Sequence, residues 1–119
     1  MFDHVSLGTS DRDASERFYE TVLGTLGIEQ TYKSEDLVAW GDFALAPASA
    51  ERPVTRRLHI GFVAPSREQV DEFWRVGTEA GYRDNGPPGE RPGYHPGYYG
   101  AFVLDPDGNN IEVVNHNRP

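Results

Sequence analysis

The chain has 119 residues, no cysteine and a formal net charge of −8, from 11 basic and 19 acidic side chains. The missing cysteines exclude disulfides, thiolate metal sites and a cysteine nucleophile, and the negative charge argues against nucleic acid as a partner. The sequence contains neither a signal-peptide pattern nor an apolar run near the roughly 18 residues of a membrane span. We therefore expect one cytoplasmic domain that does not bind a membrane.

One pattern occurs twice along the chain, at a spacing of 55 residues. The opening segment His4–Leu7 aligns with His59–Phe62, and Phe18 aligns with Phe73. The identity is weak, but the apolar pattern and the register agree. We interpret the chain as two copies of one supersecondary unit, over residues 1–50 and 58–119, with a linker at 51–57.

Each copy is predicted to begin with a strand and continue with a helix. In both strands apolar residues alternate with His and small residues, which places each His on the face opposite its apolar neighbours. Ser10 and Asp11 are candidate caps of the first helix, which ends near residues 24–27. Ser66, followed three residues later by Gln69, forms a capping-box pattern at the start of the second helix.

Strand-like segments follow each helix, so that both copies have the order βαβββ. The predicted strands are Ile28–Lys33, Leu37–Trp40 and Phe43–Ala46 in the first copy, and Tyr82–Asp84, Tyr98–Leu104 and Asn110–His116 in the second. The last two flank the turn sequence Asp105-Pro106-Asp107-Gly108. Helices on one side of a strand layer are typical of an α+β fold.

Three side chains are candidate metal ligands. His4 and His59 occupy equivalent positions in the two copies, so a pseudo-twofold axis would bring them together. Glu112 lies between Ile111 and Val113 but on the opposite face of its strand, and a cation would offset the cost of burying its carboxylate. Two imidazoles and one carboxylate match a facial ligand set that leaves open positions on the metal. A lone His on a strand is more often structural, and it is the repeat that favours a metal site.

The segment Gly86–Gly100 has an unusual composition, with five Gly, four Pro and three Tyr. One interpretation is a rigid surface loop. The other is a pocket wall or lid, because the loop leads into a predicted inner strand and offers polar tips on ring side chains. The candidate pocket residues are Tyr94, His95, Tyr98 and Tyr99. The two adjacent tyrosines point to opposite faces, so we expect only one of them to reach a substrate.

The whole chain resembles the vicinal oxygen chelate superfamily, which includes glyoxalase I, extradiol dioxygenases and the bleomycin and fosfomycin resistance proteins. The segments that carry the resemblance are His4–Leu7, Glu16–Gly24, Leu58–Phe62 and Phe102–Val113. The resemblance implies metal ligands at His4, His59 and Glu112. Glyoxalase I has a fourth ligand on the strand that corresponds to Phe43–Ala46, where this chain has no donor side chain. In that respect the chain is more similar to the three-ligand members.

The resemblance also implies a fold, a cofactor and a type of activity. We expect two βαβββ modules that form a curved mixed sheet around a metal-containing cavity, with the helices on the outer side. One divalent ion (Fe, Mn, Ni, Co or Zn) would bind a small oxygenated substrate through neighbouring oxygens, with Glu112 or hydroxide on the metal as the base. The expected activity is that of a lyase, isomerase or dioxygenase. We also expect the protein to form a homodimer.

Two alternatives to a metal-dependent enzyme stay open from the sequence. One is a small-molecule-binding or antibiotic-resistance protein that holds its ligand without turnover. The other is a structural remnant in which His4, His59 and Glu112 only hydrogen-bond to one another.

Overall fold

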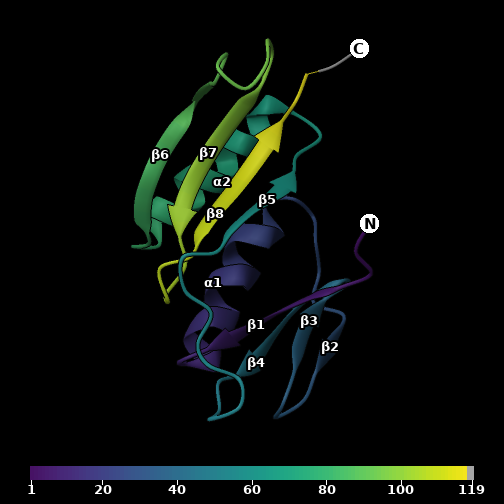
Figure 1. Cartoon of the computed structure of the whole chain (residues 1–119). Helices are drawn as coiled ribbons and strands as arrows, with labels where there is room; N and C mark the ends of the chain where they lie inside the picture. The colour runs from purple at the N-terminus through teal and green to yellow at the C-terminus, as the bar shows by residue number, and fades with distance from the viewer. Residues whose placement is uncertain (118–119) are drawn as a thin grey trace.

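The computed structural model describes residues 1–117 and shows two βαβββ units (Figure 1). The first unit contains β1 (Val5–Thr9), α1 (Arg12–Gly24), β2 (Tyr32–Lys33), β3 (Val38–Trp40) and β4 (Phe43–Pro47). The second contains β5 (His59–Val63), α2 (Arg67–Glu79), β6 (Arg83–Glu90), β7 (Tyr99–Leu104) and β8 (Asn110–Asn115). The predicted α+β fold with a repeated βαβββ pattern is confirmed. Arg118 and Pro119, the last residues of the second predicted module, lie outside the described residues.

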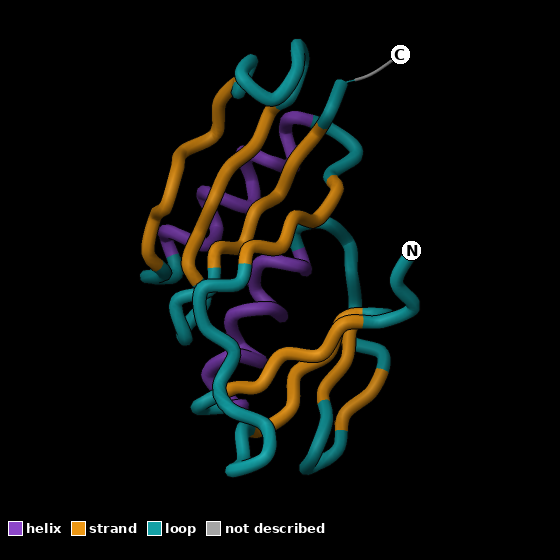
Figure 2. The backbone as a smooth tube through the Cα atoms, viewed as in Figure 1, coloured by secondary structure: helices purple, strands orange, loops and turns teal. Residues whose placement is uncertain are grey.

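The strands form two separate four-stranded sheets with the same topology (Figure 2). Sheet A has the order β1-β4-β3-β2, and sheet B has the order β5-β8-β7-β6. In each sheet the first strand is parallel to the last, and the other neighbours are antiparallel. Both sheets are therefore mixed, as expected, but they are not joined into one within the chain. Strands β1 and β5 each lie at a sheet edge.

The two helices follow the same 55-residue spacing as the opening strands, and each has 13 residues. Ser66 caps α2 by accepting a hydrogen bond from the backbone of Gln69 at 3.3 Å, as predicted. Asp11 rather than Ser10 caps α1, by accepting from the backbone of Ala14 at 3.1 Å. Neither helix in the described part of the chain has the length and apolarity needed to cross a membrane.

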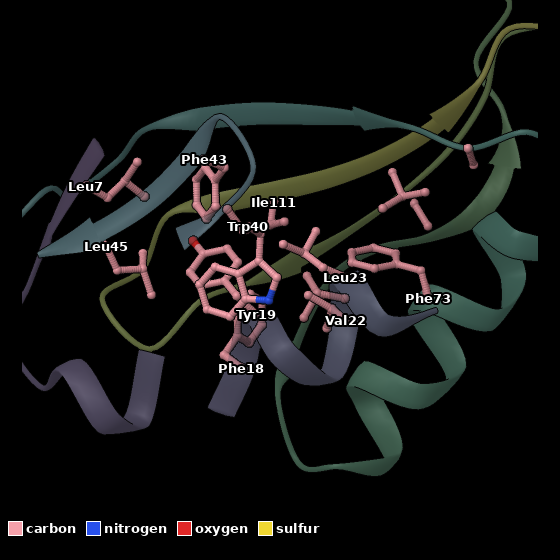
Figure 3. Packing of buried hydrophobic residues seen from close by; sticks show 14 of the residues in the cluster. Leu7, Phe18, Tyr19, Val22, Leu23, Trp40, Phe43, Leu45, Phe73 and Ile111 are labelled. Atoms are coloured by element: carbon pink, nitrogen blue, oxygen red, sulfur yellow. The ribbon is translucent and has the colours of Figure 1, made fainter. Parts of the chain in front are cut away.

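One hydrophobic core joins the two units. Helix α1 packs against both β4 and α2, and it buries four large apolar side chains, compared with two for α2. Figure 3 shows the α1 side chains lying among residues of both units, including Phe73 of α2 and Ile111 of β8. The labelled α1 residues are Phe18, Tyr19, Val22 and Leu23.

The turn between β7 and β8 also connects the units, through the buried carboxylate of Asp105. That carboxylate accepts a hydrogen bond from the Tyr19 hydroxyl of α1 at 2.6 Å. It also accepts from the backbone of Asp107 at 3.0 Å and from the backbone and side chain of Asn109 at 2.8 and 2.9 Å. Asp107 in turn accepts from Ser10, so that Ser10 serves this contact and not the helix cap. The turn predicted from the sequence therefore fixes one unit against the other.

Two predicted strand lengths were wrong. Strand β2 covers only Tyr32–Lys33. Ile28 lies instead in the turn that follows α1, where its N–H donates to the Leu23 carbonyl and its side chain packs against the core. Strand β6 continues to Glu90, through the first part of the segment interpreted as a loop. It can contain prolines because it is an edge strand, where a missing N–H is tolerated.

Candidate functional site

The candidate site lies on the face of sheet B that points away from α2, which we call the open face. Glu112 is at its centre, because β8 lies between β5 and β7. The register places Gly61 on one side of Glu112 and Phe102 on the other, and Gly86 beyond Phe102. Paired residues on neighbouring strands share a face, so these four positions form one row across the sheet.

Glycines make room for the Glu112 carboxylate. A Cβ atom at Gly100 would lie 3.0 Å from Glu112 Oε2, and one at Gly61 would lie 3.5 Å from Oε1. A side chain at Gly100 would crowd the carboxylate, whereas a Cβ at Gly61 would be in ordinary van der Waals contact with it. The side chain of Glu112 is only 4% exposed, although it lies on the face without a helix.

Both carboxylate oxygens of Glu112 have partners. His59 Nε2 lies 2.8 Å from Oε1, and the Tyr98 hydroxyl donates to Oε2. The His59 ring is half exposed, at 54%, so the pair joins a buried acceptor to an accessible imidazole. This is the contact expected from the alternation of β5 and β8.

The Tyr98 hydroxyl remains a donor across the physiological pH range. Its burial, followed by its hydrogen bond to Glu112 and the nearby negative charge, raises the pKa of Tyr98 well above its ordinary value. The positive charge of Arg91 opposes this rise in the pKa. Tyr98 therefore holds one oxygen of Glu112 and leaves the other directed at His59.

The structure does not bring His4 to the same pair. His4 precedes β1, is 72% exposed, and its Nδ1 lies 2.8 Å from a carboxylate oxygen of Asp3. Within residues 1–117 no three His, Asp, Glu or Cys side chains are grouped closely enough to share a metal ion. His59 and Glu112 are donors of the types that divalent transition metals accept, but they supply only two ligands.

His4 and His59 do line one cavity of about 510 Å³ between the two units. Its wall is mostly apolar, with Trp40 and Phe43 from sheet A and Phe62 from β5. A cavity of this size is large enough for a small ligand.

The aromatic residues of the 86–100 segment divide between the two faces. Tyr98 lies on the open face, with the Tyr94 ring 4.7 Å and the His95 ring 5.3 Å from its own. Tyr99 lies on the opposite face, where its hydroxyl donates to Asp71 at 2.5 Å. His95 Nε2 also contacts His116 Nδ1 at 2.9 Å. Tyr94 and His95 are thus grouped around Tyr98, which alone of the four candidate pocket residues contacts Glu112, and Tyr99 is separate from them.

Two further residues of the open face were not assigned a role from the sequence. Phe102 has its ring centre 6.0 Å from that of His59, and the Arg91 guanidinium carbon lies 5.4 Å from the same Phe102 ring. The face on which Phe102 lies could have been predicted from the sequence, because Phe102 alternates with Ala101 and Val103. The face of Arg91 could not, because Arg91 follows an irregular, proline-containing strand whose register shifts twice.

Comparisons with known proteins agree with this fold. Residues 1–113 match the model of the Glyoxalase/Bleomycin resistance protein/Dioxygenase superfamily. The chain is similar to the uncharacterized protein YqjT of Bacillus subtilis (strain 168), with 30% identity over 131 aligned positions that cover 93% of this chain and 95% of the relative.

Solved structures show the same similarity. A glyoxalase/bleomycin resistance protein from Albidiferax ferrireducens T118 has 34% identity and a TM-score of 0.83, with 97% of this chain and 98% of that chain covered. A putative glyoxalase from Bacillus halodurans has 26% identity and a TM-score of 0.74, with 97% and 95% covered. A lactoylglutathione lyase from Agrobacterium tumefaciens, at 24% identity and a TM-score of 0.71 over 97% and 92%, shares the fold.

Proposed function

Because the chain belongs to the glyoxalase/bleomycin resistance protein/dioxygenase superfamily, we propose that it is a metal-dependent enzyme acting on a small oxygenated substrate chelated through neighbouring oxygens. The observation that carries the proposal is the contact between His59 and the buried carboxylate of Glu112 on the open face. A bound divalent ion (Fe, Mn, Ni, Co or Zn) would act as a Lewis acid on the substrate oxygens. The reaction would be that of a lyase, an isomerase or a dioxygenase.

The two carboxylate oxygens of Glu112 have different proposed roles. Tyr98 donates to Oε2 and so fixes the plane of the carboxylate. Oε1 and His59 Nε2 are the two atoms offered to the metal. Glu112 is also the proposed base. It would accept the proton on Oε1 when that oxygen is not bound to the metal, because Oε2 already receives the Tyr98 hydroxyl.

We propose that the third ligand is His4 of the partner subunit in a homodimer. Strands β1 and β5 are both edge strands, and edge strands can pair with another chain through their unpaired backbone groups. His4 directly precedes β1 and is exposed, and His59 begins β5 and is half exposed. Pairing of β1 of one chain with β5 of the other would bring both histidines to one site.

Metal uptake by single and mixed variants tests this arrangement. The wild type is purified without chelator, and its metal content and mass in solution are compared with those of His4→Ala and His59→Ala. We expect one ion per chain and a dimer for the wild type, and no stoichiometric metal for either variant. When the two variants are co-expressed, half of the dimers would carry one intact site, so that about one ion per four chains should return.

The outcomes separate the parts of the proposal. A wild type that takes up no metal, with a thermal stability equal to that of His59→Ala, would rule out the metal site. Metal loss in both variants without recovery on co-expression would place His4 and His59 of the same chain in the site. A monomeric wild type would exclude the shared site.

The apolar cavity favours a second candidate function, the binding of a small molecule without turnover. Its wall includes Leu23, Ile28 and Trp40, and such a lining can hold a ligand with no contribution from a metal. This function predicts that small aromatic ligands protect the metal-free wild type and the Glu112→Gln variant equally against thermal unfolding, because Glu112 does not line the cavity. The metal-dependent enzyme predicts that protection requires the metal and is lost in the variant.

A further inference from the structure

Arg91 differs from the other arginines that are shielded from solvent. Three arginines in the described part of the chain are partly buried, namely Arg12, Arg67 and Arg91. Arg12 pairs with Asp13 at 3.3 Å and Arg67 pairs with Glu90 at 3.0 Å. No ion pair to Arg91 occurs among residues 1–117, although the chain has an excess of acidic residues. Arg91 therefore keeps a positive charge that no acidic side chain among these residues neutralises, and an anion could bind it.

Backbone contacts hold the Arg91 side chain in place. Its Nη2 donates to the Pro87 carbonyl at 2.7 Å and, more weakly, to the Gly100 carbonyl at 3.4 Å. Its Nε is buried and has no hydrogen-bond partner. A guanidinium has five N–H donors, so these two carbonyls leave other N–H groups free to bind an anion. The guanidinium is thus held in place with donors to spare.

Arg91 lies on the same face as the proposed metal site. Gly86 is opposite Phe102 in the register, and a Cβ at Gly86 would lie 2.8 Å from the Phe102 ring and 3.4 Å from Arg91 Nη2. Phe102 is opposite Glu112 in turn. The Phe102 ring thus has the Arg91 guanidinium 5.4 Å from its centre and the His59 ring 6.0 Å from it.

We propose that Arg91 forms an anion subsite beside the proposed metal site, so that the substrate carries a carboxylate in addition to the oxygens that chelate the metal. The inference rests on the proposed function for the position of those chelating oxygens. The flat ring of Phe102 would support the body of the substrate between the two charged ends. A carboxylate at Arg91 would supply the acceptors that the guanidinium lacks, in a charge-assisted hydrogen bond.

A pair of chelating probes tests the subsite. Catechol is neutral and offers two neighbouring oxygens, and 3,4-dihydroxybenzoate adds a carboxylate that the rigid ring keeps away from the metal. Both are titrated calorimetrically into the Ni(II)-loaded protein. We expect the wild type to bind 3,4-dihydroxybenzoate about tenfold more tightly than catechol. The intrinsic difference in chelation between the probes cancels when this ratio is compared between variants.

Arg67 provides the matched control. Its guanidinium lies 4.8 Å from the Tyr99 ring, on the opposite face of β7, and its Nε also lacks a partner. The ratio of the affinity for 3,4-dihydroxybenzoate to that for catechol should fall in Arg91→Gln to the value set by chelation of the metal alone. It should be partly retained in Arg91→Lys and unchanged in Arg67→Gln. An unchanged ratio in Arg91→Gln, or an equal loss in Arg67→Gln, would overturn the subsite.

A metal-free measurement separates failure of the subsite from failure of the proposed function. Benzoate is titrated into the metal-free wild type while the NMR signal of the Arg91 Nε–H group is followed. A saturable shift without uptake of Ni(II) would retain the subsite and reject the metal site. Uptake of Ni(II) without this shift would reject the subsite and retain the metal site. Because this titration uses the wild type, it decides the question even if Arg91→Gln does not fold.

Discussion

The two modules share their backbone plan but differ at one position that is equivalent in the two sheets. In sheet A, Ser6 of β1 is opposite Ala44 of β4. In sheet B, the residue 55 positions later, Gly61 of β5, is opposite Glu112 of β8. One site therefore has a methyl group where the other has a carboxylate. A repeated fold gives equivalent backbone positions, but the residue type at each position determines whether it can bind or react.

The modules also differ in the turn before their last strand. In the first module only Gly41 and Asp42 separate β3 from β4. In the second module the turn runs over residues 105–109 and reaches α1 through Tyr19. The longer turn thus joins the modules, whereas the shorter one makes its hydrogen bonds within the first module, to Val5 and Thr31.

The difference between the turns predicts the largest effect. Asp105→Ala removes a buried carboxylate with four hydrogen-bond donors and leaves those donors unpaired, so the free energy of unfolding should fall by about 3 kcal/mol. Asp42→Ala, at an exposed position of the short turn, should change it by less than about 0.5 kcal/mol. Urea denaturation of both variants measures this, and equal losses would show that the contact between the long turn and α1 does not stabilise the fold.

Much of the fold follows from local signals in the sequence. The 55-residue spacing places both helices because each has its cap and its apolar face at the same offset. The alternation in β5 and β8 puts His59 and Glu112 on one face, and they are in contact. The hydrogen bond between Asp105 and Tyr19 of α1 could not be predicted, because the same residues form a turn whether or not they contact α1.

The remaining features of the site depend on tertiary structure. The distance between His4 and Glu112 depends on how the two sheets are arranged, and sequence periodicity carries no information about that. The sequence also does not predict on which face of the sheet Arg91 lies, because bulges in β6 break the two-residue alternation of side chains. Regular strands could be read from the sequence, and irregular ones could not.

The hydrogen bond from Tyr98 to Glu112 predicts the next effect, on the affinity of the proposed site for a metal ion. Tyr98→Phe removes the donor to Oε2 and lets the carboxylate rotate, so the affinity for Ni(II) should fall about tenfold or more. Tyr94→Phe alters an exposed ring beside it and should leave the affinity unchanged. Calorimetric titration of Ni(II) compares them, and an equal affinity in the two variants would show that Tyr98 does not position the ligand.

Supplying the missing donor tests the comparison in the other direction. Ala44→Glu places a carboxylate at the sheet A position that corresponds to Glu112. Ala44 is one residue along β4 from Phe43, which is opposite Val5, the neighbour of His4. In the proposed dimer it would act as a fourth ligand and raise the Ni(II) affinity about tenfold. Ala46→Glu adds the same charge on the same face but further from His4, opposite Gly8, and should not. An equal gain in both variants would mean that only the added charge matters.

The smallest effect concerns the deeper burial of α1 compared with α2. Burial alone would raise the pKa of Glu16, but the hydrogen bond from Gln30 at 2.8 Å and the Lys33 ammonium at 3.0 Å lower it below its ordinary value. The ionised form is therefore favoured by folding, so its stabilisation is present above about pH 4.3 and is lost as the pH falls through the lowered pKa. The difference in unfolding free energy between the wild type and Glu16→Gln should be below about 1 kcal/mol at pH 7 and should shrink under acidic conditions. Glu20→Gln, on the exposed face of the same helix, controls for net charge, and a difference that grows as the pH falls would contradict the proposed sign.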